Sequence, residues 1–158
     1  MIEQDTIKLL RECDAGIKMG ISSIDDVACH VEDKKLYAVL TKGREDHEAL
    51  QAKIQKLLGD YQDQGKEPNP IAKGMSKVKT NVKLGMDAED ATIADLMTDG
   101  CNMGVKSLSK YLNQYKAADE QSKDITKKLI RLEEQRAVDI RKFLYCRRPR
   151  TSVRGLRL

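Results

Sequence analysis

Apolar residues recur at intervals of three and four along most of this chain, the spacing that gives an α-helix one apolar face. The pattern predicts four long helices, at about residues 5–31, 33–58, 87–115 and 119–144, and the last could also begin at residue 122. No long stretch alternates apolar and polar residues, so strands are not expected. The predicted inward positions are Ile7, Leu10, Asp14, Ile17, Ile21, Ile24, Ala28 and Val31, then Leu36, Leu40, Gly43, His47, Leu50, Ile54, Leu57 and Tyr61, then Ala91, Ala94, Thr98, Cys101, Val105, Leu108, Leu112 and Tyr115, and finally Ile125, Leu129, Leu132, Arg136, Ile140 and Phe143.

The lengths of the connections predict how these helices are arranged. Only a few residues separate the first helix from the second and the third from the fourth, so each pair should form an antiparallel hairpin. The connection between the hairpins, residues 59–87, is long and contains turn-forming residues at 65–70. Spacings of four, three and four between apolar residues predict a short amphipathic helix within it, at Ile71, Met75, Val78 and Val82. The chain is therefore predicted to be all-α: an up-down four-helix bundle of two hairpins, joined by a long crossover that carries a short helix.

Two segments have nearly the same residue pattern. Gly16–Ile24 and Gly100–Leu108 share Gly, Met, Gly, an aliphatic residue, Ser and another aliphatic residue at identical spacing, 84 residues apart. This internal repeat predicts that the second hairpin duplicates the first. Glycine inside a helix costs about 1 kcal/mol relative to alanine, so two glycines per repeat suggest a structural use. Close helix packing is the leading interpretation, and a pocket or a bend is the alternative, for Gly16, Gly20, Gly100 and Gly104.

The net charge of +4 is concentrated at one end of the chain. Residues 145–158 contain five arginines and no acidic residue, and without those arginines the chain has 24 basic and 25 acidic residues. We therefore expect a bundle over residues 1–144 that offers no nucleic-acid or membrane surface. A basic, disordered tail over residues 145–158 would follow, able to make a weak contact with an anionic partner.

Composition also bears on the compartment. The apolar runs are far shorter than the roughly 18 residues of a membrane span, and the N-terminus is acidic, so neither a span nor a signal peptide is expected. The four cysteines show no CxxC spacing, which favours reduced structural thiols over a zinc or redox motif. These features favour a cytoplasmic protein. The partner is left open, and a homo-oligomer is compatible with the sequence.

Two motifs of the chain resemble those of a known superfamily. Leu9–Gly16 resembles the first-helix motif of small ferritin-like families of unknown function that are related to rubrerythrins, and Asp99–Cys101 resembles their third-helix motif. The crossover, with its glycines, prolines and lysines, also resembles theirs, and the resemblance covers about residues 5–144. It implies a ferritin-like fold. Ferritin-like oxidases hold a di-iron centre with one Glu on each of helices 1 and 3 and Glu-x-x-His on each of helices 2 and 4.

Most of that ligand set is missing from this chain. The first-helix and third-helix glutamates would fall at Ile17 and Cys101, and the residue three before His47 is Arg44. The fourth-helix pair would fall near residues 129 and 132, which are leucines, and no Glu-x-x-His occurs anywhere. A cation beside such a centre repels metal ions. We therefore expect no cofactor, with iron as the alternative.

Other polar residues are candidates for the centre of the bundle. The hairpin geometry and the repeat place Asp14, Thr98 and Arg136 in one buried polar layer, which predicts an ion pair between Asp14 and Arg136 because buried charges are usually paired. A weak alternative is a mononuclear metal site formed by His47, Cys101 and Glu133 in a neighbouring layer. The favoured interpretation of His47 is a hydrogen-bonded core residue.

The functional expectation follows from these absences. No catalytic residue can be assigned, so the chain is expected to be a metal-free ferritin-like bundle that acts as a binding or structural module. The alternative is a metal-dependent oxidoreductase, related to the rubrerythrins, with an atypical ligand set. A third class is an adaptor that binds nucleic acid or membranes through the arginine-rich tail and the crossover lysines.

Overall fold

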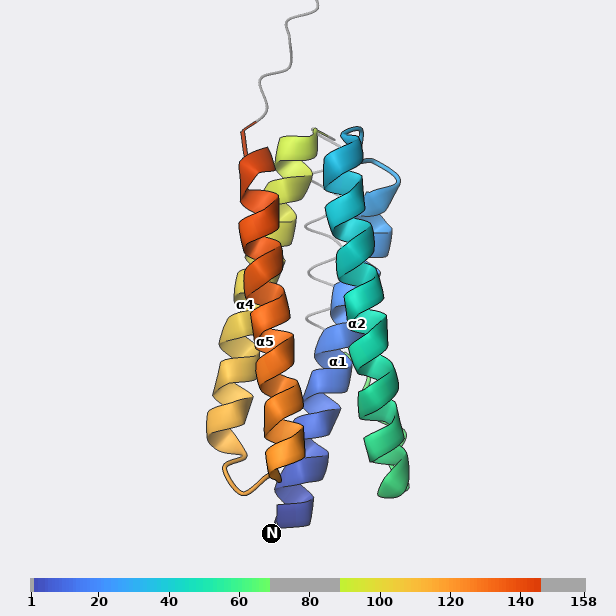
Figure 1. The fold of residues 1–158 in the computed structure, drawn as a ribbon, viewed down its shortest axis with the longest axis vertical. Coiled ribbons are helices and arrows are strands. Elements are labelled where there is room, and N and C mark those ends of the chain that lie inside the picture. The colour runs from blue at the N-terminus through green and yellow to red at the C-terminus, as the bar shows by residue number, and fades with distance from the viewer. Residues whose placement is uncertain (1, 69–88, 146–158) are drawn as a thin grey trace, which may run out of the picture.

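The computed structural model of the protein describes residues 2–68 and 89–145. Four long helices make up most of these residues: α1, Ile2–Ala28; α2, Lys34–Asp60; α4, Asp90–Gln114; and α5, Glu120–Ile140 (Figure 1). A single 3-10 turn, η1 (Arg141–Phe143), follows α5. The described residues contain no strand, so the prediction of an all-α protein with four long helices is confirmed. The expected crossover helix at 71–82, the expected helix start at Asp87 and the tail after residue 145 lie outside the described residues.

The four helices lie lengthwise against one another. Along the bundle, α1 and α5 run in one direction and α2 and α4 in the other (Figure 1). Each helix packs against two neighbours, because α1 contacts α2 and α4, and α5 contacts the same two helices. The α1 and α5 helices also contact each other across the centre. Because α2 and α4 run in the same direction, the end of α2 and the start of α4 lie at opposite ends of the bundle (Figure 1).

The core consists of two apolar clusters stacked along the bundle axis. One cluster lies toward the end of the bundle at which α1 begins, and it contains Leu10, Cys13, Ile17, Leu50, Ile54, Leu58, Leu108, Ile125 and Leu129. The other lies toward the opposite end and contains Ile24, Val27, Leu36, Leu40, Ile93, Ala94, Met97, Ile140 and Phe143. Between these two sets, α1 has no buried residue, and the buried residues of the other helices are Gly43 and His47 on α2, Cys101 on α4, and Glu133 and Arg136 on α5. The apolar core is therefore interrupted by a polar level near mid-height.

The predicted inward face matches the buried residues best on α2. Its buried residues are Leu36, Leu40, Gly43, His47, Leu50, Ile54 and Leu58, and only the last differs from the expectation of Leu57. On α4 the buried face includes Ile93 and Met97, which the pattern did not select, and Thr98 is only half-buried. The buried face of α4 is rotated about the helix axis relative to the predicted face. On a segment with many small residues, several choices of inward residue fit a spacing of three and four equally well.

Side chains from the start of each hairpin hold the turn of the other hairpin. Asp33 and Asp119 are the N-caps of α2 and α5, and their carboxylates accept hydrogen bonds from backbone N–H groups of the first helical turn. The Asp90 carboxylate accepts the Asp33 N–H at 2.8 Å, and the Thr6 hydroxyl accepts the Asp119 N–H at 2.8 Å. Both turns are thus fixed from outside their own hairpin.

Candidate functional site at the centre of the bundle

Four polar side chains meet at the polar level of the core, and we call them the central polar cluster: His47 from α2, Cys101 from α4, and Glu133 and Arg136 from α5. All four are buried, and His47 is fully inaccessible to solvent. Each lies on the inward face of its helix, which carries apolar residues in the neighbouring turns. Helix periodicity therefore places them inward, and their polar groups must find partners within the protein.

Glu133 is the acceptor that these side chains share. One of its oxygens, Oε1, contacts His47 Nε2 and lies 3.5 Å from Arg136 Nη1. Burial alone would raise the pKa of Glu133, but the hydrogen bond from His47 and the charge of Arg136 outweigh burial and lower this pKa below its ordinary value. Glu133 is therefore an ionised carboxylate inside the bundle.

Both ring nitrogens of His47 are engaged. Its Nδ1 lies 2.6 Å from the carbonyl oxygen of Gly43, which can only accept a hydrogen bond, so Nδ1 carries a proton. Its Nε2 contacts the carboxylate of Glu133. The ring is therefore held between the backbone of its own helix and a side chain of α5.

Arg136 is only partly satisfied by the cluster. Its side chain is 5% exposed and pairs with Glu133 through Nη1, one turn earlier on the same helix. Its Nε and Nη2 are buried and have no hydrogen-bond partner among the described residues. These two nitrogens form the side-on edge of the guanidinium, the edge that carboxylates and phosphates bind in a bidentate manner.

Cys101 contributes a neutral thiol to the cluster. Burial raises its pKa to about 12, the nearby charge of Arg136 opposes this rise, and Glu133 adds to it. The Glu133 carboxylate lies beside this thiol. A thiol with so high a pKa is a weak nucleophile and a poor metal ligand at neutral pH, because both roles require the thiolate.

Three glycines line this cluster. A Cβ at Gly20 would lie 3.1 Å from His47 Nε2, and a Cβ at Gly104 would lie 3.5 Å from Glu133 Cγ. A Cβ at Gly43 would lie only 2.7 Å from Arg136 Nε. The second glycine of each repeated motif thus leaves room for a polar side chain rather than for a neighbouring helix backbone.

The first glycine of each motif has a different environment from the one expected. Gly16 and Gly100 are exposed, and a Cβ at either position would have no neighbour within 4 Å. The expectation of close helix packing therefore does not describe these two positions within the described chain. Sequence spacing alone did not separate the two glycines of each motif, because positions four apart lie on nearly the same side of a helix.

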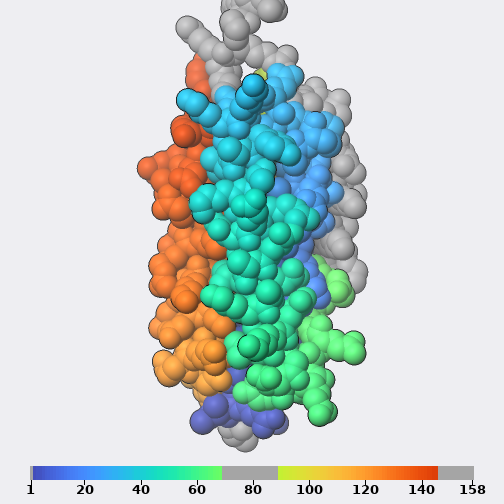
Figure 2. Space-filling model, turned by 45° about the vertical axis from the view of Figure 1, so that its right-hand side comes forward, coloured from blue at the N-terminus to red at the C-terminus, as the bar shows by residue number. Residues whose placement is uncertain are grey.

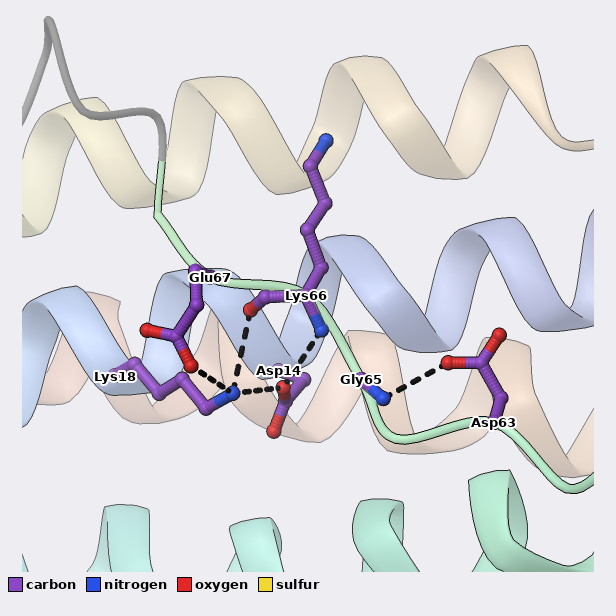
Figure 3. A network of polar contacts seen from close by, with 6 residues as sticks. All are labelled: Asp14, Lys18, Asp63, Gly65, Lys66 and Glu67. Atoms are coloured by element: carbon purple, nitrogen blue, oxygen red, sulfur yellow. Dashed lines mark hydrogen bonds and ion pairs between the residues drawn. The ribbon is translucent and has the colours of Figure 1, made fainter.

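Asp14 lies in a separate network on α1, away from the central polar cluster. Its Oδ2 is 2.9 Å from Lys18 Nζ and accepts the backbone N–H of Lys66 at 3.1 Å (Figure 3). Lys18 also donates to Glu67 at 3.0 Å, and Lys66 pairs with Glu12. The segment that follows α2 is therefore fastened along α1 by charges on both sides.

Lys18 and Gly65 show how tightly this segment fits. Burial would lower the pKa of Lys18, but its hydrogen bonds to Asp14 and Glu67 outweigh burial and raise this pKa above its ordinary value. Gly65 has a φ of +89°, and a Cβ there would lie 2.3 Å from Asp14 Oδ2. Only glycine meets both conditions without strain.

The expected ion pair between Asp14 and Arg136 is not formed. Each residue is buried, as expected, but each has an ionic partner one turn away in its own helix: Lys18 for Asp14 and Glu133 for Arg136. Thr98, the third member of the expected layer, donates its hydroxyl hydrogen to the carbonyl of Ala94 at 2.7 Å. Both pairs have spacings, i,i+4 and i,i+3, that place oppositely charged side chains side by side on one helix. These spacings are visible in the sequence, and they would have predicted the observed partners.

The residues at the centre do not fit a di-iron site. Ile17 and Leu129, at expected ligand positions, are buried apolar residues of the core, and Glu133 is the one carboxylate of the central polar cluster. Its charge is already countered by Arg136 and His47. Within the described ranges, no group of three or more His, Cys, Asp or Glu side chains is arranged to hold a metal ion.

None of the helices that the structure describes is both long enough and apolar enough to cross a membrane.

Comparisons with known proteins found no match. No family model matches the chain, and neither the curated proteins nor the solved structures contain a match.

Proposed function

We propose that this chain is a ferritin-like bundle of two repeated hairpins in which the protein's own cations take the place of a metal centre, and that it acts as a binding or structural module. The observation that carries the proposal is the state of Glu133. Its carboxylate is held by Arg136 and His47 at the level of the bundle where the expected ligand positions lie. A metal ion at this carboxylate would have to displace both side chains and overcome the charge of Arg136.

The helix arrangement supports the ferritin-like part of the proposal. The directions of the four helices require a long return between α2 and α4, as in bundles that have one long crossover. The proposal also includes a cytoplasmic setting. Cys13, Cys29 and Cys101 are free thiols, which suits a reducing compartment.

Contacts at equivalent positions support the duplication. Thr6 and Asp90 are 84 residues apart, the offset of the repeated motifs, and each accepts the backbone N–H of the N-cap residue in the other hairpin. Gly20 and Gly104 have the same offset, and each faces one member of the His47–Glu133 pair. Such reciprocal contacts are what a pseudo-twofold axis between two copies of one hairpin would produce.

One observation favours the alternative of a metal-dependent oxidoreductase. His47 and Cys101, two of the three residues in the weak alternative site, both contact the third, Glu133. If Arg136 moved away, these side chains could offer one nitrogen, one sulfur and one carboxylate to a single metal ion. The site would differ from a di-iron centre in ligand type and in number.

Metal binding distinguishes the two candidates. Protein purified without a tag should contain no stoichiometric metal, and added Fe(II), Mn(II) or Zn(II) should leave its melting temperature unchanged within about a degree. A ligand specific for the native state adds about 2.7 kcal/mol of stability at 100 times its Kd, so binding would be evident. A clear rise in Tm with iron, or about two irons per chain as in a di-iron centre, would refute the metal-free proposal.

A further inference from the structure

A groove of about 440 Å³ lies between α2 and α5, beside the central polar cluster. These two helices pack side by side, and both are visible in the space-filling view (Figure 2). Gly43 and Arg136 are buried and form the floor of the groove, whereas the charged side chains that line its rim are largely exposed. The size is within the range of pockets that hold small molecules.

The charges along the groove leave an excess of cations. Six charged residues line it: Lys42, Asp46, Lys128, Arg131, Arg136 and Asp139. The two acidic residues are engaged, Asp46 by Lys42 at 2.8 Å and Asp139 by the amide of Gln135 at 2.8 Å. Lys128 and Arg131 have no ion-pair partner among the residues that the structure describes. The groove therefore has a net charge of +2 and unpaired cations at its rim.

At the floor of the groove, Arg136 has hydrogen-bond donors without acceptors. Arg136 remains charged at all physiological pH values, and its buried Nε and Nη2 lack acceptors within the described chain. Behind it, Glu133 is engaged by Nη1 of Arg136 and by His47, so this carboxylate does not satisfy the Nε and Nη2 edge. Buried donors without an acceptor are costly, so an anion that enters from the groove would satisfy this edge of the guanidinium.

We propose that the groove between α2 and α5 binds a small oxyanion, a carboxylate or phosphate group, through the side-on edge of Arg136. Two oxygens of the anion accept from Nε and Nη2, and Lys128 and Arg131 contact it from the rim. Because both nitrogens are covered, the guanidinium turns slightly toward the groove on binding. Gly43 allows the guanidinium to lie at the floor of the groove, because a Cβ there would come within 2.7 Å of Nε. The inference rests on the proposed function and gives the binding module a ligand class.

Titration of the full chain followed by NMR tests this inference. The probes are sodium phosphate and sodium acetate at constant ionic strength, with sodium chloride as the reference. The Arg136 Nε–H resonance should shift saturably with phosphate, with acetate or with both, and the probe that saturates identifies the oxyanion. A shift that grows with chloride just as it does with the probes, or no saturable shift with either probe, would overturn the inference.

Variants separate a built site from general charge attraction. The double change Lys128→Ala and Arg131→Ala should weaken binding about tenfold without disturbing the core, because both residues are exposed. The double change Lys110→Ala and Lys127→Ala removes the same two positive charges from exposed positions that do not line the groove, and should bind as the wild type does. Arg136→Lys keeps the charge but lacks the bidentate edge, so it should lose at least as much affinity.

The same variants decide against the inference if they behave alike. Equal loss of binding by the groove double variant and by the control double variant Lys110→Ala and Lys127→Ala would show that only the overall charge of the protein matters, and would overturn it. Failure of the anion titration leaves the metal-free centre intact, because that claim is tested by metal content. Iron binding would refute the proposed function regardless of the anion result, so the two failures are distinguishable.

Discussion

Replacing Glu133 by glutamine is expected to destabilise the protein strongly. Glutamine keeps the shape of the side chain but removes the one negative charge that His47 and Arg136 share. The guanidinium of Arg136 cannot respond by releasing a proton. The variant therefore leaves a buried cation without a counter-charge.

The magnitude follows from how little solvent reaches these groups. The side chains of Glu133 and Arg136 are 10% and 5% exposed, so water screens the lost interaction only slightly. Removing one partner of a buried ion pair costs about 3 to 5 kcal/mol, because the other charge remains buried. We expect a loss of this size in the free energy of unfolding, a large share of the total stability of such a domain.

Urea denaturation followed by circular dichroism measures this loss. Glu134→Gln is the matched control, because Glu134 is the exposed neighbour and should change stability by less than about 0.5 kcal/mol. The double change Glu133→Leu and Arg136→Met should recover much of the loss, since apolar replacements of buried ion pairs are often neutral. A cost below about 1 kcal/mol for Glu133→Gln, with additive effects in the double variant, would refute the buried network.

The pH dependence gives the same test a second readout. The pKa of Glu133 is lowered from its ordinary value of 4.5 in the folded protein. Its ionised form therefore contributes stability that is complete above pH 4.5 and is lost as the pH falls through the lower folded pKa. The wild type should lose this contribution in acid, and Glu133→Gln should show a flatter profile over the same range. Identical profiles would contradict the lowered pKa.

Three further outcomes are expected. Gly65→Ala should cost at least about 1 to 2 kcal/mol in urea denaturation, because of its positive φ and the closeness of Asp14, whereas Gly59→Ala, with no neighbour within 4 Å, should not destabilise. Gly16→Ala should stabilise α1 by up to about 1 kcal/mol, and Gly20→Ala should gain less because its methyl group would press on His47; equal gains would count against the close contact. Cys13 and Cys101, whose pKa burial raises to about 12, should resist iodoacetamide at pH 8 while the exposed Cys29 reacts, and peptide mass spectrometry would detect any exception.

The helices could be predicted from the sequence because burial repeats with the period of the helix. On α2, the expected seam from Leu36 to Ile54 coincides with the buried residues, including the polar exception His47. The N-cap of α2 at Asp33 is equally local, since it depends on a carboxylate that accepts the backbone N–H groups two and three residues later. Local chemistry of this kind does not depend on how the helices pack.

The pairing of the polar core residues could not be predicted in the same way. Whether Arg136 faced Asp14 depended on the register between α1 and α5, whereas its pair with Glu133 lies within α5 and has a spacing that the sequence shows. The role of Asp14 depended on the path of the chain after α2, because the backbone N–H of Lys66 reaches it from 52 residues away. Such long-range contacts leave no periodic signal in the sequence.

Crystals of the protein soaked in Fe(II) and measured at the iron absorption edge would show whether the centre of the bundle binds iron. We expect no anomalous-difference peak at the central polar cluster, with the carboxylate of Glu133 held by His47 and Arg136. An iron peak bound by His47 and Glu133, with Arg136 turned away, would contradict this expectation.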